Sequence, residues 1–274
     1  MRRPTPILLL ALACARPSPG QAPEPARTPG APVPEDMVPV AAGEFLMGCN
    51  AAVDADCAPA EGAPRRVRVS AFAIGRTEVT AGAYARCVAA GACAKAVALG
   101  DCNHGHADRA DRPANCVDWS QASAYCAWTG GRLPTEAEWE KAARGTDGRR
   151  WPWGNDFPET LGAWRANVGE GLARDLWVRD GWELDAPVGR FPDGASPYGA
   201  LDMAGNVAEW TADWHADYDA SAGRDPAGPA AGTVKAVRGG SWISYRKLVR
   251  TSARDWHSPD QWLPHVGFRC ALGL

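Results

Sequence analysis

The chain has 274 residues, of which 46% are hydrophobic and 22% charged, so it can bury a sizeable core and has the composition of a globular protein. Its formal net charge is -3, and no lysine or arginine run is interleaved with aromatic residues, which argues against nucleic acid or an anionic membrane surface as a partner. Thirteen tryptophans against five phenylalanines and five tyrosines indicate a loop-rich core or a ligand groove, because each indole has a large apolar body and one donor that needs a partner.

The N-terminal segment has the features of an export signal. Arg2 and Arg3 precede an apolar run over residues 7–13, which is too short to span a bilayer but fits the middle of a secretory signal. The run ends in Ala-Leu-Ala-Cys at Cys14, which is similar to a bacterial lipobox. We predict a signal peptide over residues 1–14 with lipidation at Cys14, and an ordinary cleaved signal is the alternative. The expected location is the bacterial cell envelope, in the periplasm or on the outer surface.

A linker and one folded domain follow. Residues 15–36 are dominated by proline and alanine, with few large apolar residues, so they cannot bury enough surface to fold. No later shift in composition marks a second boundary, and residues 37–274 are therefore predicted to form a single domain.

Three helices are predicted from their capping residues. They cover residues 80–87, 120–128 and 135–144, with Thr80, Ser120 and Thr135 as the respective N-caps. The third is the clearest, because Thr135 and Glu138 have the spacing of a capping box. Short strands are indicated at residues 66–74 and 235–238, and long loops rich in glycine and proline separate the elements. Regular structure should be a minority of the chain.

Eight cysteines remain once Cys14 is set aside, and an even number in an exported protein favours disulfides, although eight cysteines allow 105 connectivities. Short loops favour two of the cysteine pairs, and the third pair is a guess among the cysteines that remain. These pairs are Cys49 with Cys57, Cys87 with Cys93, and Cys102 with Cys116.

The third pair has a rival interpretation. Cys102 is followed closely by His104, His106 and Asp108, which places a thiol, two imidazoles and a carboxylate near one another in a possible metal site. An oxidising compartment consumes free thiols, which favours the disulfide.

Residues 201–211 read as a functional loop, because their order fits neither an amphipathic helix nor an alternating strand. Asp202 and Glu209 offer hard oxygen ligands, and the carbonyls of Gly205 and Val207 could complete the mixed coordination that Ca2+ prefers. A solvated turn before a strand is the alternative.

Seven motifs occur in the order found in one known family, and the likeness that they mark extends over essentially the whole chain from Met37 to Leu274. They are residues 43–48 (GEFLMG), 78–80 (EVT), 131–140 (GRLPTEAEWE), 151–154 (WPWG), 205–210 (GNVAEW), 238–242 (RGGSW) and 267–270 (GFRC). The chain thereby resembles the formylglycine-generating enzyme (sulfatase-modifying factor) family. The resemblance implies an α+β fold related to C-type lectins, with little regular secondary structure and with stabilisation by disulfides and calcium.

The resemblance also implies specific sites. One calcium set would comprise Asp202, Gly205, Val207 and Glu209, with Asp202 replacing a more usual amide. The second would comprise Asn167, Val168, Asp180 and Trp182, through side-chain oxygens of the first and third and backbone carbonyls of the others. Ordinary turn residues are the alternative for Asn167 and Asp180. A Cys126–Cys270 disulfide is implied as well.

The chain departs from the family at the catalytic segment. Active relatives hold copper with two cysteines shortly after the Gly-Gly-Ser-aromatic motif, whereas residues 241–254 contain no cysteine. Ser244 stands at the first position, and the second falls in a shortened stretch near Arg246. A hydroxyl is a poor Cu(I) ligand, so copper is not expected as a cofactor, and iron is the metal left open.

No other reaction centre is evident in the sequence. Ser241 or Ser244 with His257 suggests a nucleophile and a base, but no third partner or oxyanion motif accompanies them. His215, His257 and His265 are too scattered along the chain to indicate a metal triad.

We therefore expect an exported, lipid-anchored binding or accessory protein that recognises a peptide, glycan or envelope partner through the retained groove. The alternatives are a metal-dependent oxidoreductase, acting on a protein side chain or a small exported molecule, and a structural envelope protein. The matched active-site region contains Ser241, Trp242, Ser244 and Arg254, and Arg250 and Arg269 lie in or beside it. The candidates for a groove wall are Trp210, Trp242, Trp256 and Trp262, although core packing is the commoner role for any one tryptophan.

Overall fold

The computed structural model describes residues 32–158, 164–169, 180–219 and 221–274. The predicted signal peptide, the lipidation site Cys14 and most of the predicted linker lie outside these residues. None of the described helices combines the length and apolar character that a membrane span requires.

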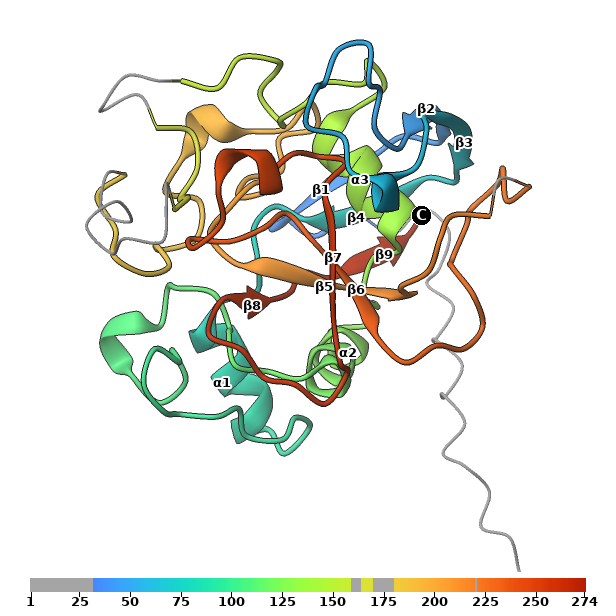
Figure 1. Ribbon diagram of the computed structural model, residues 1–274. Helices are drawn as coiled ribbons and strands as arrows, with labels where there is room; N and C mark the ends of the chain where they lie inside the picture. Colours follow the sequence, from blue (N-terminus) through green and yellow to red (C-terminus); the bar gives the residue numbers. More distant parts are fainter. Residues whose placement is uncertain (1–31, 159–163, 170–179, 220) are drawn as a thin grey trace, which may run out of the picture.

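Short strands form three separate sheets in the described chain (Figure 1). The first is antiparallel with the order β1 (Met37–Val40), β4 (Phe72–Gly75), β9 (Ala271–Gly273). The second pairs β2 (Gly43–Met47) with β3 (Arg65–Val69) in antiparallel register. The third has the order β7 (Arg254–His257), β6 (Lys235–Arg238), β5 (Ala208–Trp214), β8 (Val266–Gly267), and only its β5–β8 pair is parallel.

The predicted strand at 235–238 is confirmed as β6, and the strand structure predicted over 66–74 is confirmed as two strands, β3 and β4. The extended strand is interrupted at Ser70 and Ala71, so β3 and β4 belong to two different sheets. Ser70 donates its hydroxyl and its backbone N–H to Asp225, which holds this corner. The sequence pattern indicates strand structure over this segment but does not show that its two halves belong to different sheets.

Three α-helices are present in the described residues. They are α1 (Ala81–Ala89), α2 (Trp119–Trp128) and α3 (Glu136–Arg144). Short 3-10 turns lie at η1 (Pro59–Glu61), η2 (Ala107–Arg109), η4 (Pro192–Gly194) and η5 (Arg246–Leu248).

Two of the three predicted helix caps are confirmed. Thr80 accepts a hydrogen bond from the third residue of α1, and Thr135 forms the capping box with Glu138. The N-cap of α2 is Asp118 rather than Ser120, because Asp118 completes a capping box with Gln121. Ser120 instead donates its hydroxyl to Asp118 at 2.7 Å.

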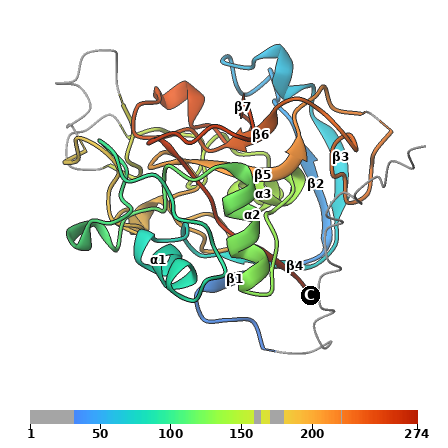
Figure 2. The same cartoon turned by 90° about the horizontal axis from the view of Figure 1, so that it is seen from below.

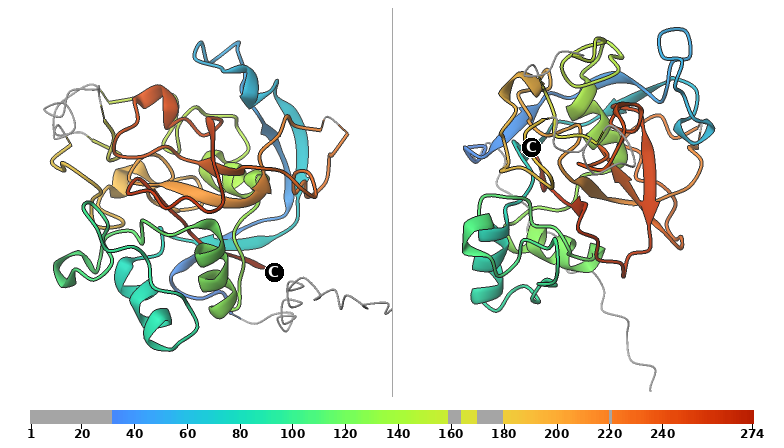
Figure 3. Two further views of the ribbon diagram at one scale, coloured as in Figure 1. Left: turned by 60° about the horizontal axis from the view of Figure 1, so that its bottom comes forward. Right: turned by 60° about the vertical axis from the view of Figure 1, so that its left-hand side comes forward.

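Helix α3 lies at the centre of the molecule, where it packs against β2, β3, β5 and β6, and all nine of its residues are buried. Helices α1 and α2 lie together at one end, and the β2–β3 hairpin lies on the far side (Figures 2 and 3). The interior thus consists of one buried helix and short strands from two sheets that pack against it.

Four disulfides tie this loop-rich fold together. The predicted pairs Cys49–Cys57, Cys87–Cys93 and Cys102–Cys116 are confirmed, as is the Cys126–Cys270 bridge that the resemblance implied. The rival metal site at residues 102–108 was wrong, because its thiol is consumed in a disulfide.

Candidate functional site

Residues 239–253 form the loop of the β6–β7 hairpin, so Arg238 and Arg254 are paired across the base of the matched active-site segment. Gly239 and Gly240 turn the chain out of β6 with φ values of 91° and 62°, in the left-handed region that glycine favours. A Cβ on Gly240 would lie 2.8 Å from Val249, which shows how closely the two limbs of the loop approach. Backbone bonding anchors the loop, because the N–H of Trp242 donates to the carbonyl of Asn206.

A cavity of about 370 Å³, here called the hairpin cavity, opens between this loop and the adjoining sheet. Its lining includes Ser241, Ser244, Tyr245, Leu248, Ala253, Asp255, His257 and His265, together with parts of β5 and β6. The two serines interact mainly with each other: the N–H of Ser241 donates to Ser244 Oγ at 3.0 Å, and the hydroxyls are 3.4 Å apart.

Nothing activates either serine within the described chain. No hydrogen bond joins His257 to Ser241 or Ser244 among these residues, so the nucleophile-and-base arrangement gains no support from the geometry.

The structure brings together two of the three histidines that the sequence left scattered. The rings of His257 and His265 have centroids 5.9 Å apart and planes inclined at 70°. Both are half-buried. Burial, reinforced by the neighbouring His257, lowers the pKa of His265 to about 4, and burial also lowers the pKa of His257. Both imidazoles are therefore neutral at pH 7.

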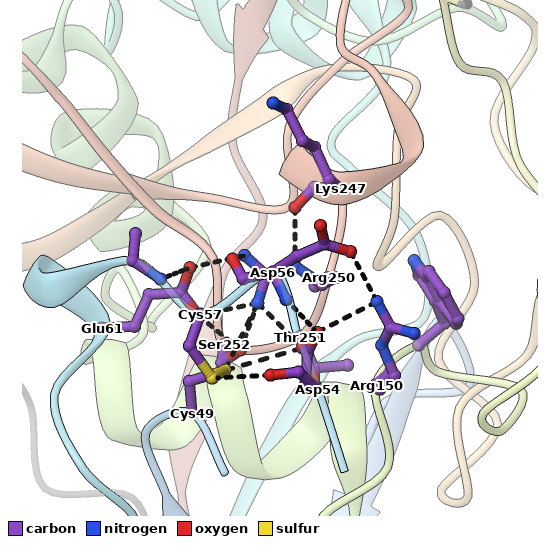
Figure 4. Close-up of polar contacts among 12 residues, drawn as sticks. Cys49, Asp54, Asp56, Cys57, Glu61, Arg150, Lys247, Arg250, Thr251 and Ser252 are labelled. Atoms are coloured by element: carbon purple, nitrogen blue, oxygen red, sulfur yellow. Dashed lines mark hydrogen bonds and ion pairs between the residues drawn. A yellow bond between two sulfur atoms is a disulfide. The ribbon is translucent and has the colours of Figure 1, made fainter. Parts of the chain in front are cut away.

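Arg250, also in the matched region, is fixed by a buried charge network (Figure 4). Its guanidinium donates to both oxygens of Glu61, at 2.5 and 2.8 Å, and to Asp54 at 2.9 Å. It also lies 3.5 Å from Sγ of Cys49. Cys49, Asp54 and Cys57 are the one group of close metal-ligand side chains in the described residues, but a disulfide joins the two sulfurs, so no thiolate is available.

Arg254 and its strand partner Arg238 are held in the same way. Arg254 donates to both oxygens of Glu136, at 2.7 and 2.9 Å, and its guanidinium lies 3.9 Å from the ring centre of Tyr218. Arg238 donates to Glu140 at 2.6 Å. We call Arg238, Arg250, Arg254 and their carboxylate partners Asp54, Glu61, Glu136 and Glu140 the arginine cluster.

The expectation that tryptophans form the groove wall was wrong for the hairpin cavity, because none of the four named lines it. Trp210 and Trp242 are buried, and the indole of Trp210 donates to the carbonyl of Val117. Trp256 and Trp262 are exposed. A wider depression of about 820 Å³ beside the cavity does contain an indole, that of Trp151, and Tyr245 lines both spaces.

The two predicted calcium loops lie against each other, because the N–H of Asn206 donates to the carbonyl of Asn167 at 2.8 Å. In the second set, Asn167 is buried and its Oδ1 has no hydrogen-bond partner within the described residues, as a ligand atom would. Asp180 accepts from the N–H groups of Val168 and Trp182, and burial raises its pKa to about 6. This set fits a hard cation.

In the first predicted calcium set, the two carboxylates Asp202 and Glu209 have different surroundings. Glu209 already accepts two hydrogen bonds from Arg269 and one from Trp139, so an ion would share this carboxylate with a guanidinium. Near Asp202, by contrast, Glu78 is buried with an unpartnered Oε2 in the described chain, and burial followed by the charge of Asp202 raises its pKa. Sequence reasoning missed Glu78, which appeared only within the 78–80 motif.

Comparison with known proteins identifies similar sequences and structures. The family model described as "Sulfatase-modifying factor enzyme 1-like domain" matches residues 21–274. The formylglycine-generating enzyme of Thermomonospora curvata is 44% identical over 60% of this chain and 56% of its own length. The inactive C-alpha-formylglycine-generating enzyme 2 of Bos taurus is 39% identical over 62% and 53%. The chain spans about half the length of these curated relatives.

A solved structure covers more of the chain. PvdO from Pseudomonas aeruginosa superposes with a TM-score of 0.72 at 30% identity, over 87% of this chain and 94% of that one. CarF, at 22% identity and a TM-score of 0.58, shares the fold. Both active and inactive proteins are thus among the relatives.

Proposed function

From the premise that the chain belongs to the sulfatase-modifying factor family, we propose that it is a binding or accessory protein without copper-dependent formylglycine-generating activity. Its ligand site is the hairpin cavity. The ligand is a peptide, a glycan or an envelope partner. The protein acts in the bacterial cell envelope, where a lipid on Cys14 anchors it.

A preserved cavity without thiols carries this proposal. Residues 241–254 contain no cysteine, and all eight cysteines from Cys49 onward are paired in disulfides, so no thiolate is left to hold Cu(I). The existence of inactive relatives is consistent with this loss of chemistry. The four disulfides also support an oxidising, extracytoplasmic location.

The surroundings of the cavity suit an extended ligand. Tyr245 lines both the hairpin cavity and the wider depression next to it, so one ligand can occupy both spaces. Tyr245 and Leu248 are exposed and offer apolar surface, while Arg150, Lys247 and Asp156 in the depression provide charges for orientation. Calcium bound through Asn167 and Asp180 would hold the adjoining loop in place.

The enzymatic part of the proposal is tested by mass spectrometry. The purified, disulfide-intact chain is incubated with a sulfatase-type peptide that contains cysteine, with oxygen, reductant and added copper. We expect no conversion of the cysteine to an aldehyde while an active family enzyme converts it under the same conditions. Conversion by this chain would overturn the proposal.

The binding part is tested with a fluorescein-labelled sulfatase-type peptide, read by anisotropy. Leu248→Glu places a charge at the mouth of the cavity on an exposed side chain, so the fold should tolerate it. The matched control is Leu99→Glu, at an exposed leucine outside the cavity. We expect Leu248→Glu to weaken binding at least about tenfold and Leu99→Glu to leave it unchanged; no binding by the wild type, or equal effects, would reject this peptide site.

A metal-dependent oxidoreductase is the second candidate, and the His257–His265 pair in the cavity favours it. Metal analysis of the chain purified without added transition metals separates the two candidates, because tightly held iron or copper would favour the enzyme. The third candidate, a structural envelope protein, would not require a cavity at the matched active-site segment.

A further inference from the structure

His257 and His265 reach the hairpin cavity from two different strand regions. His257 ends β7, and its ring lies 6.1 Å from that of the buried Trp210, which restricts its position. His265 directly precedes β8, and its carbonyl accepts a hydrogen bond from the N–H of Ala208 at the start of β5. Both backbones are therefore fixed by the sheet, and the ring pair does not depend on a mobile loop.

The separation of the rings fits a shared metal ion. Metal–nitrogen bonds of about 2.0–2.1 Å place two imidazoles on one tetrahedral centre with ring centroids roughly 5–6 Å apart. The observed centroid distance of 5.9 Å lies in that range.

The chemical state of the rings fits as well. Burial keeps both imidazoles neutral at pH 7, which is the form that binds a metal. Across the described chain no side-chain hydrogen bond satisfies either ring, although both line a solvent-reachable cavity. Two neutral imidazoles that line one cavity are thus available to a metal ion that enters it.

A carboxylate accompanies the pair. Asp255 stands two residues before His257 on β7, so the two side chains share one face of the strand. Asp255 lines the same cavity and places a negative charge near the pair, although its carboxylate already accepts a hydrogen bond from the N–H of Trp256 at 2.8 Å.

We propose that His257 and His265 bind one divalent first-row transition metal in the hairpin cavity, with exogenous ligands at the remaining positions. Imidazole ligands suit iron, copper and zinc, whereas calcium takes oxygen ligands, so this site is separate in chemistry from the loops at Asn167 and Asp202. The inference goes beyond the binding role proposed above and does not depend on it, but it names ligands for the oxidoreductase candidate.

Titration with Co2+ tests the site, because the visible absorption of the bound ion reports its coordination without any assay of activity. The full, disulfide-intact chain is stripped with chelator and then kept in excess Ca2+, which occupies oxygen-rich sites. We expect the wild type to bind one equivalent of Co2+ with bands that indicate nitrogen ligands, and Zn2+ to displace it.

Variants assign the ligands. His257→Ala and His265→Ala should each weaken Co2+ binding by more than about tenfold, since loss of even an outer partner of a metal ligand costs about that much. The control is His106→Ala, at an exposed histidine outside the cavity, and it should bind like the wild type. Thermal unfolding of each variant in Ca2+ verifies the fold, and His257→Gln provides a second variant of similar volume.

Two results would overturn the proposal: no stoichiometric Co2+ binding by the wild type, or affinities within about twofold of the wild type in both alanine variants. The outcome is independent of the peptide experiment. Leu248→Glu should keep its Co2+ site while losing the peptide, so failure of one proposal can be distinguished from failure of the other.

Discussion

The arginine cluster and the hairpin cavity are both built on the β6–β7 hairpin and share Arg254, yet the arginines of the cluster and the two histidines of the cavity differ in whether their polar atoms are paired. In the cluster, each of Arg238, Arg250 and Arg254 donates to at least one buried carboxylate. In the cavity, His257 and His265 have neighbours but no side-chain hydrogen bonds within the described residues.

This difference separates scaffold from site. Burying charges is costly unless they are paired, so the cluster can persist only with its partners in place, and removing one partner exposes the full cost. The cavity leaves neutral groups open to solvent or ligand, where little stability depends on them. Arginines that the family resemblance placed in the active-site region thus hold the loop, while two histidines that are too scattered in the sequence to indicate a metal site face the cavity.

The largest effect is expected at Glu140, which is fully buried and accepts from Arg238, from Arg144 and from the N–H of Gly48. Glu140→Ala would leave two buried guanidinium groups without this carboxylate, and we expect it to lower the free energy of unfolding by about 3–5 kcal/mol. Chemical denaturation measures it. Glu44→Ala, which removes an exposed partner of Arg66 at 3.8 Å, is the control and should cost less than about 1 kcal/mol. Equal losses of unfolding free energy in the two variants would mean that burial does not determine how much an ion pair contributes to stability.

The scaffold was largely predictable because its signals are local. The capping box at Thr135 and the short-loop disulfides depend on residues a few positions apart, and the structure contains them. Even the error at α2 was a local one. Asp118 and Ser120 can both cap, and Gln121 three residues after Asp118 was the signal that discriminates them.

The site was less predictable because it depends on strand order. His257 and His265 come together only because β7, β6, β5 and β8 form one sheet, and nothing in the eight-residue spacing indicates this. Likewise, the partners of Arg250 lie about 190 residues earlier in the chain, so its structural role was hidden.

The calcium loops provide a second test of paired against unpaired groups. Glu209→Gln breaks its ion pair with the buried Arg269, and we expect a cost of about 3 kcal/mol with or without Ca2+. Asn167→Ala removes an unpartnered oxygen, so it should be nearly neutral in chelator and destabilising in Ca2+. Thermal unfolding in both buffers measures this. A Glu209 effect confined to Ca2+ would instead make that carboxylate a calcium ligand.

Asp213 tests whether every buried carboxylate near the arginine cluster is stabilised by a positive charge. Burial, together with the nearby Glu136, raises its pKa to about 7, so its protonated form is favoured in the folded state. Its contribution to stability is present below the unfolded pKa of about 3.8 and is lost as pH rises through about 7. Asp213→Asn has no carboxyl group to titrate and avoids this loss. We therefore expect the free energy of unfolding of the variant, minus that of the wild type, to increase by about 1–3 kcal/mol from pH 4.5 to pH 8. A pH-independent difference in denaturant unfolding would contradict the raised pKa.

The smallest effect on stability is expected in the cavity, and it completes the comparison. His257 is half-buried and has no hydrogen bond to lose within the described chain, so His257→Ala in metal-free buffer should change the free energy of unfolding by no more than about 1 kcal/mol. The same denaturation experiment with added Zn2+ should stabilise the wild type and leave the variant unchanged, because only a protein with an intact site gains the free energy of binding. A cost as large as that of Glu140→Ala in the absence of metal would place His257 in the scaffold. The division between the arginine cluster and the hairpin cavity would then fail, because unpaired and paired polar groups would contribute equally to the fold.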